Sequence, residues 1–199
     1  DWSDASDDAL EFVNVDNIST STPVLNNLGQ VAGRLDGNFA FLYTLGAEQP
    51  LQVFDEVFYK VDDLNDSGVI CGRAEVPSSR GKKTITTAVR FDTTTLTMDP
   101  LCNNNINEQA VAINADGDVA ISYIGDHVYH NEDGLLLVDD LILDSNDDEQ
   151  LWFAGEHEIF DLSERTEIGY GFLVGRHHEI FPDGSQTIRG FVLRPITAP

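Results

Sequence analysis

LNNLGQVAGR at residues 25–34 indicates the architecture of this protein, because the same pattern returns at residues 64–73 as LNDSGVICGR. Both copies place an apolar residue before an Asn, a glycine three residues after that Asn, and a second glycine four residues later. Two weaker copies follow, INADGDVAIS at 113–122 and LSERTEIGYG at 162–171. Self-similarity at a period of about 20–50 residues is typical of repeat architectures, so the pattern predicts four repeats.

Each copy of the pattern predicts a tight β-hairpin. Asn-x-x-Gly favours a type I turn followed by a residue at positive φ, a conformation that glycine adopts with least strain. In the fourth copy Thr166 stands where this glycine is expected. We therefore expect the fourth turn to differ from the others or to be longer.

Strand-like runs of alternating apolar residues follow each hairpin. The runs lie at residues 39–43 and 51–54, 87–91 and 95–98, 127–130 and 135–139, and 190–194. One strand is missing after the fourth hairpin, and residues 11–15 (EFVNV), just before the first repeat, are the candidate to supply it. The repeats are then centred on residues 25–54, 64–101, 113–141 and 162–194, with sixteen strands in all.

This arithmetic predicts an all-β protein, a single β-propeller domain over residues 1–199. We expect four blades of four antiparallel strands, closed by the N-terminal strand 11–15. Half of a larger propeller completed by a dimer, or a β-sandwich, are the rival architectures. If the strand before each hairpin is innermost, the following pairs line a central channel whose backbone carbonyls could bind a cation: Val24-Leu25, Asp63-Leu64, Ala112-Ile113 and Asp161-Leu162.

The repeat resembles the bacterial extracellular HAF-type repeat family, in which an Ile-Asn-x-x-Gly-x-Val-x-Gly hairpin is joined to a His-Ala-Phe-Leu-type strand. Residues 25–33 followed by FAFLY at 39–43 match best, with Phe39 where the family has His. Residues 64–72 followed by AVRF at 88–91 match next, whereas the third copy has Ile121 in place of the second glycine. GFVLRP at 190–195 is similar to the family's closing segment. The resemblance implies a surface-exposed repeat protein and supplies no catalytic residues.

The composition is strongly acidic, with 35 Asp and Glu residues against 11 Lys and Arg and a formal net charge of −24. A field of this sign repels nucleic acids and anionic membranes, so neither is an expected partner. No window approaches eighteen consecutive apolar residues, which argues against membrane insertion. The acidic, lysine-poor composition favours a secreted or cell-surface location.

An acidic run at residues 139–149 is a candidate calcium loop, because calcium prefers oxygen ligands. Its candidate ligands are Asp144, Asn146, Asp147, Asp148 and Glu149. The alternative is a solvated loop between the third and fourth repeats. Asp63-x-Asn65-x-Ser67-Gly68 also resembles the first half of an EF-hand loop, but Ala74 occupies the twelfth position, where a glutamate is needed, and the hairpin accounts for the same residues.

Two further features leave alternatives open. Cys71 and Cys102 could form a disulfide in an oxidising compartment or remain as buried thiols. Aromatic residues gather in the last repeat, where they either pack between blades or, if exposed, offer a platform for stacking sugars; they are Trp152, Phe153, Phe160, Tyr170 and Phe172.

No nucleophile elbow, phosphate loop or dinucleotide fingerprint occurs in the sequence. We therefore expect a non-enzymatic, secreted or cell-surface β-propeller that acts as a binding or structural display module. The expected partner is a carbohydrate or another surface protein. One alternative is a polysaccharide-acting hydrolase or lyase with carboxylates at one mouth of the channel. The other is a calcium-stabilised repeat module of a larger surface protein.

Overall fold

The computed structural model describes residues 23–77, 84–102, 108–122, 127–138, 156–167, 171–181 and 183–193, which form strands joined by turns and loops. The strands are β1 (Val24–Leu25), β2 (Gln30–Arg34), β3 (Phe39–Thr44), β4 (Leu51–Leu64), β5 (Val69–Pro77), β6 (Thr84–Asp92), β7 (Thr97–Pro100), β8 (Gln109–Ile113), β9 (Val119–Ser122), β10 (His127–His130), β11 (Gly134–Leu137), β12 (Glu156–Leu162), β13 (Leu173–Ile180) and β14 (Gln186–Leu193). Their pairings are antiparallel and join strands that are consecutive in the chain. The all-β prediction is confirmed. This part of the chain contains no helix of the length and apolar character that a membrane span requires.

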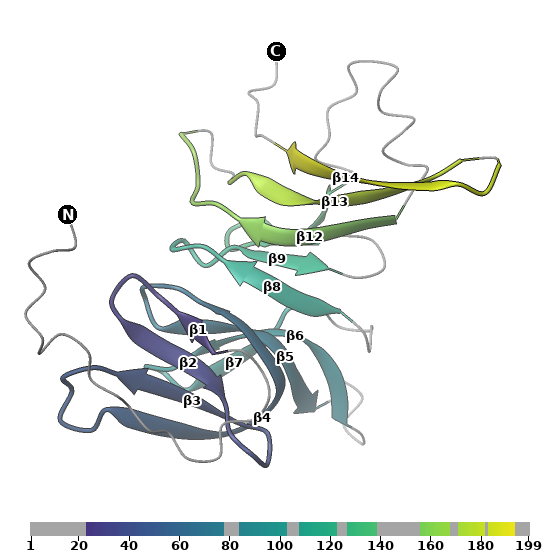
Figure 1. Ribbon diagram of the computed structural model, residues 1–199. Coiled ribbons are helices and arrows are strands. Elements are labelled where there is room, and N and C mark those ends of the chain that lie inside the picture. The colour runs from purple at the N-terminus through teal and green to yellow at the C-terminus, as the bar shows by residue number, and fades with distance from the viewer. Residues whose placement is uncertain are drawn as a thin grey trace, which may run out of the picture.

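The strands group into four successive units, called here units 1 to 4: β1–β4, β4–β7, β8–β11 and β12–β14 (Figure 1). Units 1 and 2 share β4, whose first part pairs with β3 and whose last part pairs with β5. These two units therefore form one curled sheet of seven strands. The predicted repeats start at the last residue of each unit's first strand, which is Leu25, Leu64, Ile113 and Leu162.

The predicted separate strand at residues 51–54 is wrong, because these residues are only the start of β4. This strand continues for 14 residues, since residues 51–64 contain no Gly, Pro or Asn to favour a turn. The pairing register with β5 shifts near Phe58 and again near Val61. Such bulges bend a strand, which lets β4 pass from one unit into the next. The other predicted runs fall on observed strands with shifted ends, and residues 11–15 lie outside the described residues.

The repeated hairpin turns have the predicted conformation. Gly29, Gly68 and Gly117 have φ values of 72°, 78° and 83°. Each donates its N–H to the carbonyl oxygen of the repeat's Asn three residues earlier, at 3.2, 3.1 and 3.1 Å. The fourth connection, from β12 to β13, is longer, as the loss of glycine at Thr166 predicts; the N–H of Ser163 donates to the carbonyl oxygen of Phe172 at 2.9 Å across it.

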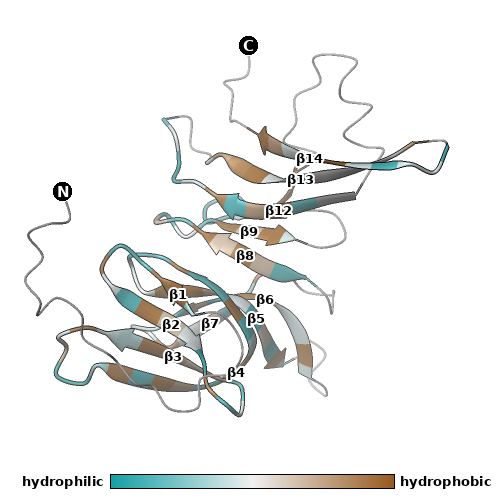
Figure 2. Cartoon of the chain, in the orientation of Figure 1, coloured by the Kyte–Doolittle hydropathy of each residue, from teal (hydrophilic) through white to brown (hydrophobic). Residues whose placement is uncertain are grey.

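Three apolar clusters form the core, one at each junction between successive units. The first contains Phe54, Phe58 and Phe91, with Phe54 and Phe58 both packed edge-on against Phe91. In β9, Val119 and Ile121 face the cluster shared with unit 2, whereas Ala120 faces the cluster shared with unit 4. Alternate residues of one strand point to opposite faces, so β9 is buried on both sides. This explains the continuous apolar run at residues 119–121, and Figure 2 shows apolar residues in β8 and β9.

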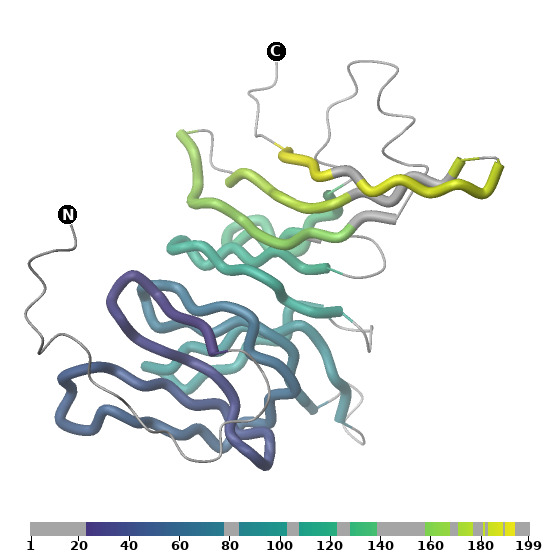
Figure 3. Tube along the Cα trace, in the orientation of Figure 1, coloured from purple at the N-terminus to yellow at the C-terminus, as the bar shows by residue number. Residues whose placement is uncertain are grey.

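The units are stacked face to face in an open curve. The sheet of β1–β7 and the sheet of β12–β14 lie at opposite ends of the molecule (Figures 1 and 3). Among the described strands, β1 and β14 are not paired with each other. The observed architecture is therefore a stack of antiparallel sheets.

Candidate functional site

The Asn of the repeated pattern joins each unit to the next. The side-chain amide of Asn26 donates to the carbonyl oxygen of Asn65 at 3.0 Å, and that of Asn65 donates to the carbonyl oxygen of Asn114 at 3.0 Å. The amide of Asn114 in turn donates to the carbonyl oxygen of Ser163 at 3.3 Å. We call this series the asparagine ladder. Its three asparagines are all buried.

The other atom of each ladder side chain holds its own hairpin turn. Oδ1 of Asn65 accepts the backbone N–H groups of Ser67 and Val69 at 3.1 and 2.9 Å. Oδ1 of Asn26 accepts those of Leu28 and Gln30 in the same way. Each ladder position uses both an acceptor and a donor, and the asparagine amide supplies both without a change of protonation.

The last unit has a serine at the ladder position, where no further unit follows among the described strands. Oγ of Ser163 accepts the N–H of Phe172 at 2.8 Å, so it still caps its own loop. Sequence reasoning assigned these residues to turns and missed their role between units. The sequence signal that could have revealed this role is the presence of Asn in three repeats and of Ser in the fourth.

Carboxylates next to the ladder also connect successive units. The carboxylate of Asp66 accepts the backbone N–H of Asn27 at 2.9 Å, and Glu164 accepts the backbone N–H of Ala115 at 2.9 Å. Part of the protein's acidity therefore has a structural use, because these anions satisfy turn N–H groups of the preceding unit.

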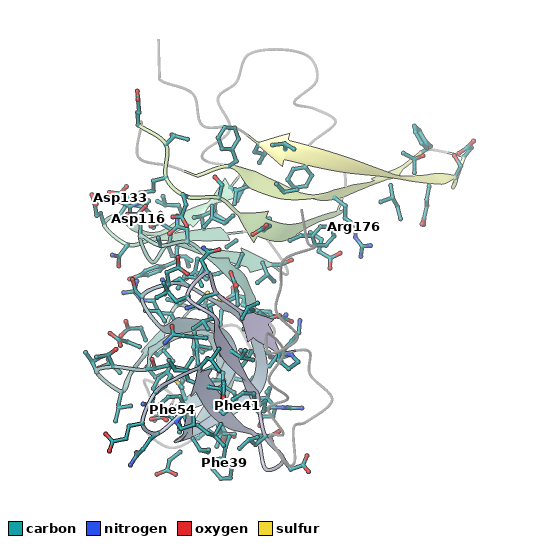
Figure 4. The ribbon with its side chains drawn as sticks, turned by 60° about the vertical axis from the view of Figure 1, so that its left-hand side comes forward. Phe39, Phe41, Phe54, Asp116, Asp133 and Arg176 are labelled. Atoms are coloured by element: carbon teal, nitrogen blue, oxygen red, sulfur yellow. The ribbon has the colours of Figure 1, made fainter. Side chains whose placement is uncertain are left out.

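Arg165 and Asp118 form a two-point ion pair between units 4 and 3. Nε and Nη2 of Arg165 each lie 2.7 Å from an oxygen of Asp118, whose side chain is 2% exposed. Burial raises the pKa of Asp118, but the bonds from Arg165, from Asn114 and from the N–H of Asn131 outweigh it and hold this pKa below its ordinary value. The neighbouring Asp116 lies at the same edge of the molecule as Asp133 (Figure 4).

Of the two segments that the sequence offered as calcium loops, the structure describes only the EF-hand-like one at residues 63–68. In the EF-hand-like segment, Asp63 accepts the N–H groups of Leu64 and Ile113 at 2.8 and 2.9 Å, and Asn65 belongs to the ladder. These oxygens serve the hairpin and its neighbour, in agreement with the hairpin alternative. The candidate ligands Asp144, Asn146, Asp147, Asp148 and Glu149 lie outside the described residues. In the described part, no group of three or more His, Cys, Asp or Glu residues is placed to hold a metal ion.

The strands before the hairpins do lie next to one another, β1 by β4, β4 by β8 and β8 by β12. Leu64, Ile113 and Leu162 are buried in the three core clusters, whereas Leu25 is exposed. Leu25, Leu64 and Ile113 also line a hollow toward one end of these strands, and a second hollow lies toward the other end. A central channel requires the closed ring and stays a prediction.

The larger hollow, called here the axial groove, has a volume of about 350 Å³ and lies between β4, β8, β9 and β12. Its walls are formed by Lys60, Asp62, Gln109, Val111, Ser122, Glu158, Ile159 and Phe160. It lies toward the beginnings of β8 and β12, whereas the ladder follows the ends of these strands. The smaller hollow, about 180 Å³, lies beside the ladder.

Asp62 is the most deeply buried charged group of the axial groove, with a side chain 8% exposed. Its Oδ1 accepts from Lys60 at 2.5 Å and from Gln109 at 2.7 Å. Its Oδ2 is buried without a hydrogen-bond partner in the described part of the chain. Burial raises the pKa of Asp62 above its ordinary value of 3.8, although the bonds from Lys60 and Gln109 act in the opposite direction.

The opposite wall of the groove carries an aromatic ring and a second ion pair. Nε of Arg176 donates to Glu158 at 2.6 Å, and the guanidinium lies 5.4 Å from the centre of the Phe160 ring. Phe160 is 47% exposed and Phe172 is 39% exposed, so neither belongs to a core between units. For these two residues the core-packing prediction is wrong. Trp152, Phe153 and Tyr170 lie outside the described residues.

Both cysteines are free and buried, which answers the question that the sequence left open. They lie in the same cluster between units 2 and 3. Burial raises the pKa of the Cys71 thiol well above its usual range, and the carboxylates of Asp63 and Asp62 add to this. Burial, followed by the effect of Glu108, also raises the pKa of Cys102.

Comparison with protein-family models, with curated proteins and with solved structures found no match, so the site is interpreted from its own geometry.

Proposed function

We propose that this chain is a non-enzymatic, secreted or cell-surface repeat module that binds a partner or displays it on a rigid scaffold. The observation that carries the proposal is the asparagine ladder, which fixes each unit against the next through buried hydrogen bonds. Rigid scaffolds of this kind place recognition in grooves and loops. The axial groove is the recognition site that we assign to the module.

A polysaccharide-acting hydrolase or lyase is the second candidate, and the axial groove favours it in one respect. The groove holds two carboxylates, and the pKa of Asp62 is raised by burial. Paired carboxylates of contrasting protonation are what glycosidic cleavage requires. The binding proposal is preferred because Glu158 is engaged by Arg176 and Oδ1 of Asp62 is engaged by two donors.

One experiment distinguishes the binding module from the polysaccharide-acting enzyme. The full chain is incubated with insoluble and soluble polysaccharides, and both its retention on the polymer and the release of new reducing or unsaturated ends are measured. Retention, or binding to a surface protein, without new ends supports the module. Catalytic release of new ends that Asp62→Asn abolishes overturns it in favour of the enzyme.

We also propose that the stack closes into a four-bladed ring, with residues 11–15 as the fourth strand of unit 4. Unit 4 has three described strands where units 1 to 3 have four, counting β4 twice. Both end faces of the stack expose apolar side chains, Phe39 and Val53 in unit 1 and Val174 and Val192 in unit 4. A cysteine pair at Val13 and Val192 should cross-link within one chain if the strand adds beside β14, and between chains if the ring is completed by a dimer.

The alternative of a calcium-stabilised module, with the ion bound at residues 144–149, is tested by thermal unfolding. The Tm is compared in millimolar calcium and in chelator at matched ionic strength. A ligand that binds the folded state at 100 times its dissociation constant stabilises it by about 2.7 kcal/mol, which is a measurable rise in Tm. An unchanged Tm would show that calcium does not stabilise the folded chain.

A further inference from the structure

We infer that the axial groove is a binding site for a neutral saccharide, recognised by Asp62 and Gln109 on one wall and by the Phe160 ring on the other. This inference rests on the proposed binding function and names the chemical class of the ligand. The volume of the axial groove, about 350 Å³, falls at the lower end of the range found for small-ligand sites, roughly 300–1,000 Å³.

The unfilled acceptor in the groove calls for a ligand that donates hydrogen bonds. A buried carboxylate oxygen without a donor is costly, and buried polar groups in proteins are almost always paired. Oδ2 of Asp62 is such an oxygen in the described structure. Asp62 lines the groove beside Gln109 and Ser122, so the hydroxyl groups of a bound ligand lie next to this carboxylate while Lys60 keeps its ion pair with Oδ1.

The charges of the groove are balanced, which favours a neutral ligand. Asp62 is paired with Lys60 and Glu158 with Arg176, in a chain whose formal net charge is −24. A charged ligand would have to displace one of these partners and leave a charge unpaired. A sugar instead supplies both donors and acceptors, and Gln109 and Ser122 offer both in return.

The apolar part of the groove matches the other side of a sugar ring. Phe160 is about half exposed and lines the groove from β12, together with Ile159, whereas Val111 lines it from β8. A pyranose carries aliphatic C–H groups on its ring faces and hydroxyl groups at its edges. It can therefore stack on Phe160 while its hydroxyls reach the polar wall. Among the described residues that line the groove, Phe160 is the one aromatic side chain that can act as the sugar-stacking platform considered from the sequence.

The test applies the full chain to an array of neutral glucans, mannans and galactans, uronate-containing glycans and sulfated glycans. The tightest neutral oligosaccharide is then titrated against the wild type, Asp62→Asn and Phe160→Ala. Each substitution should weaken binding by about tenfold or more, since a hydrogen bond to a charged group or a stacking contact is lost.

Matched controls are Phe172→Ala, which removes an exposed aromatic of the same unit outside the groove, and Asp36→Asn, which removes an exposed charge from the β2–β3 turn. Both should bind within about twofold of the wild type. Thermal unfolding verifies that each variant is folded, and Phe160→Ala decides the question if Asp62→Asn does not fold.

Three results overturn the inference: no neutral glycan is bound, only anionic glycans are bound, or both groove variants bind as tightly as the wild type. The absence of glycan binding leaves the broader binding proposal intact, because a surface protein remains a possible partner. Release of new sugar ends from a bound glycan contradicts the non-enzymatic proposal and leaves the saccharide site standing.

Discussion

The side-chain amide of Asn65 donates a hydrogen bond of 3.0 Å to the backbone carbonyl of Asn114, which lies 49 residues further along the chain. The same side chain accepts two N–H groups of its own turn. One buried residue thus shapes the hairpin of unit 2 and fixes the position of unit 3. Because the arrangement recurs at Asn26 and Asn114, the same residue type makes an equivalent bond at each of the three described junctions between units.

Gly72 is required by a close approach between β5 and β4. A Cβ atom at this position would lie 2.2 Å from the carbonyl oxygen of Lys60. Gly72→Ala should therefore lower the free energy of unfolding by about 3 kcal/mol, the range for overpacking that forces backbone to move. Gly190→Ala is the control, because its Cβ would meet nothing closer than 3.9 Å. Equal urea midpoints for the two variants would contradict the observed packing.

Asp118 should stabilise the fold only where its carboxyl is ionised. Asp118→Asn removes a buried partner of Arg165, so at pH 7 it should lower the free energy of unfolding by about 3 kcal/mol. The pKa of Asp118 is lowered by folding, so its contribution is complete above its unfolded value near 3.8 and is lost as the pH falls through the folded pKa. The difference from the wild type should thus shrink in acid. Glu132→Gln, at a side chain 74% exposed, is the control with little effect at any pH.

Asp62 should show the opposite pH dependence. Its pKa is raised by folding, so its favourable contribution is complete below its unfolded value near 3.8 and is lost as the pH rises through the folded pKa. The free energy of unfolding of Asp62→Asn should therefore rise relative to the wild type between pH 3 and pH 7. Urea denaturation across this range measures it. A difference that stays constant or falls with pH would show that Asp62 is not destabilised by burial.

The two thiols should be inert in the native protein. Cys71 and Cys102 are buried, and burial raises the pKa of each, so little thiolate is exposed to reagent. A disulfide-exchange reagent should label neither residue at pH 8 and should label both in urea without added reductant. Rapid labelling of the native chain, or no labelling in urea, would contradict the buried free thiols.

The repeats, the hairpins and the strand order could be predicted because they depend on local sequence. Asn-x-x-Gly specifies a turn with a positive φ wherever it occurs, and Gly29, Gly68 and Gly117 all adopt it. The merging of residues 51–54 into β4 was missed, because it depends on the lack of Gly, Pro and Asn over the following ten positions rather than on residues 51–54 themselves.

The bonds between repeats could not be read from any one repeat. Asp118 meets Arg165 across 47 residues and Gln109 meets Asp62 across 47, and no local pattern marks either pair. The aromatic character of Phe160 fitted both a core position and an exposed platform, and the structure places it in the lining of the axial groove. The adjacent Ile159 is buried in the third cluster, so alternation along β12 turns Phe160 to the other face of the strand.

The most direct test of the account is the free energy of unfolding of Asn65→Asp, measured with urea at pH 7 and in acid. The introduced carboxylate keeps the acceptor for the turn but loses the donor to Asn114. It should cost about 2–3 kcal/mol at pH 7, the penalty for an unsatisfied buried group. As the carboxyl is protonated it regains a donor, so the loss should diminish in acid. Ser67→Ala, an exposed position in the same turn and outside the ladder, should change stability by under about 0.5 kcal/mol. An Asn65→Asp variant as stable as Ser67→Ala at pH 7 would contradict the claim that the asparagine ladder holds the units together.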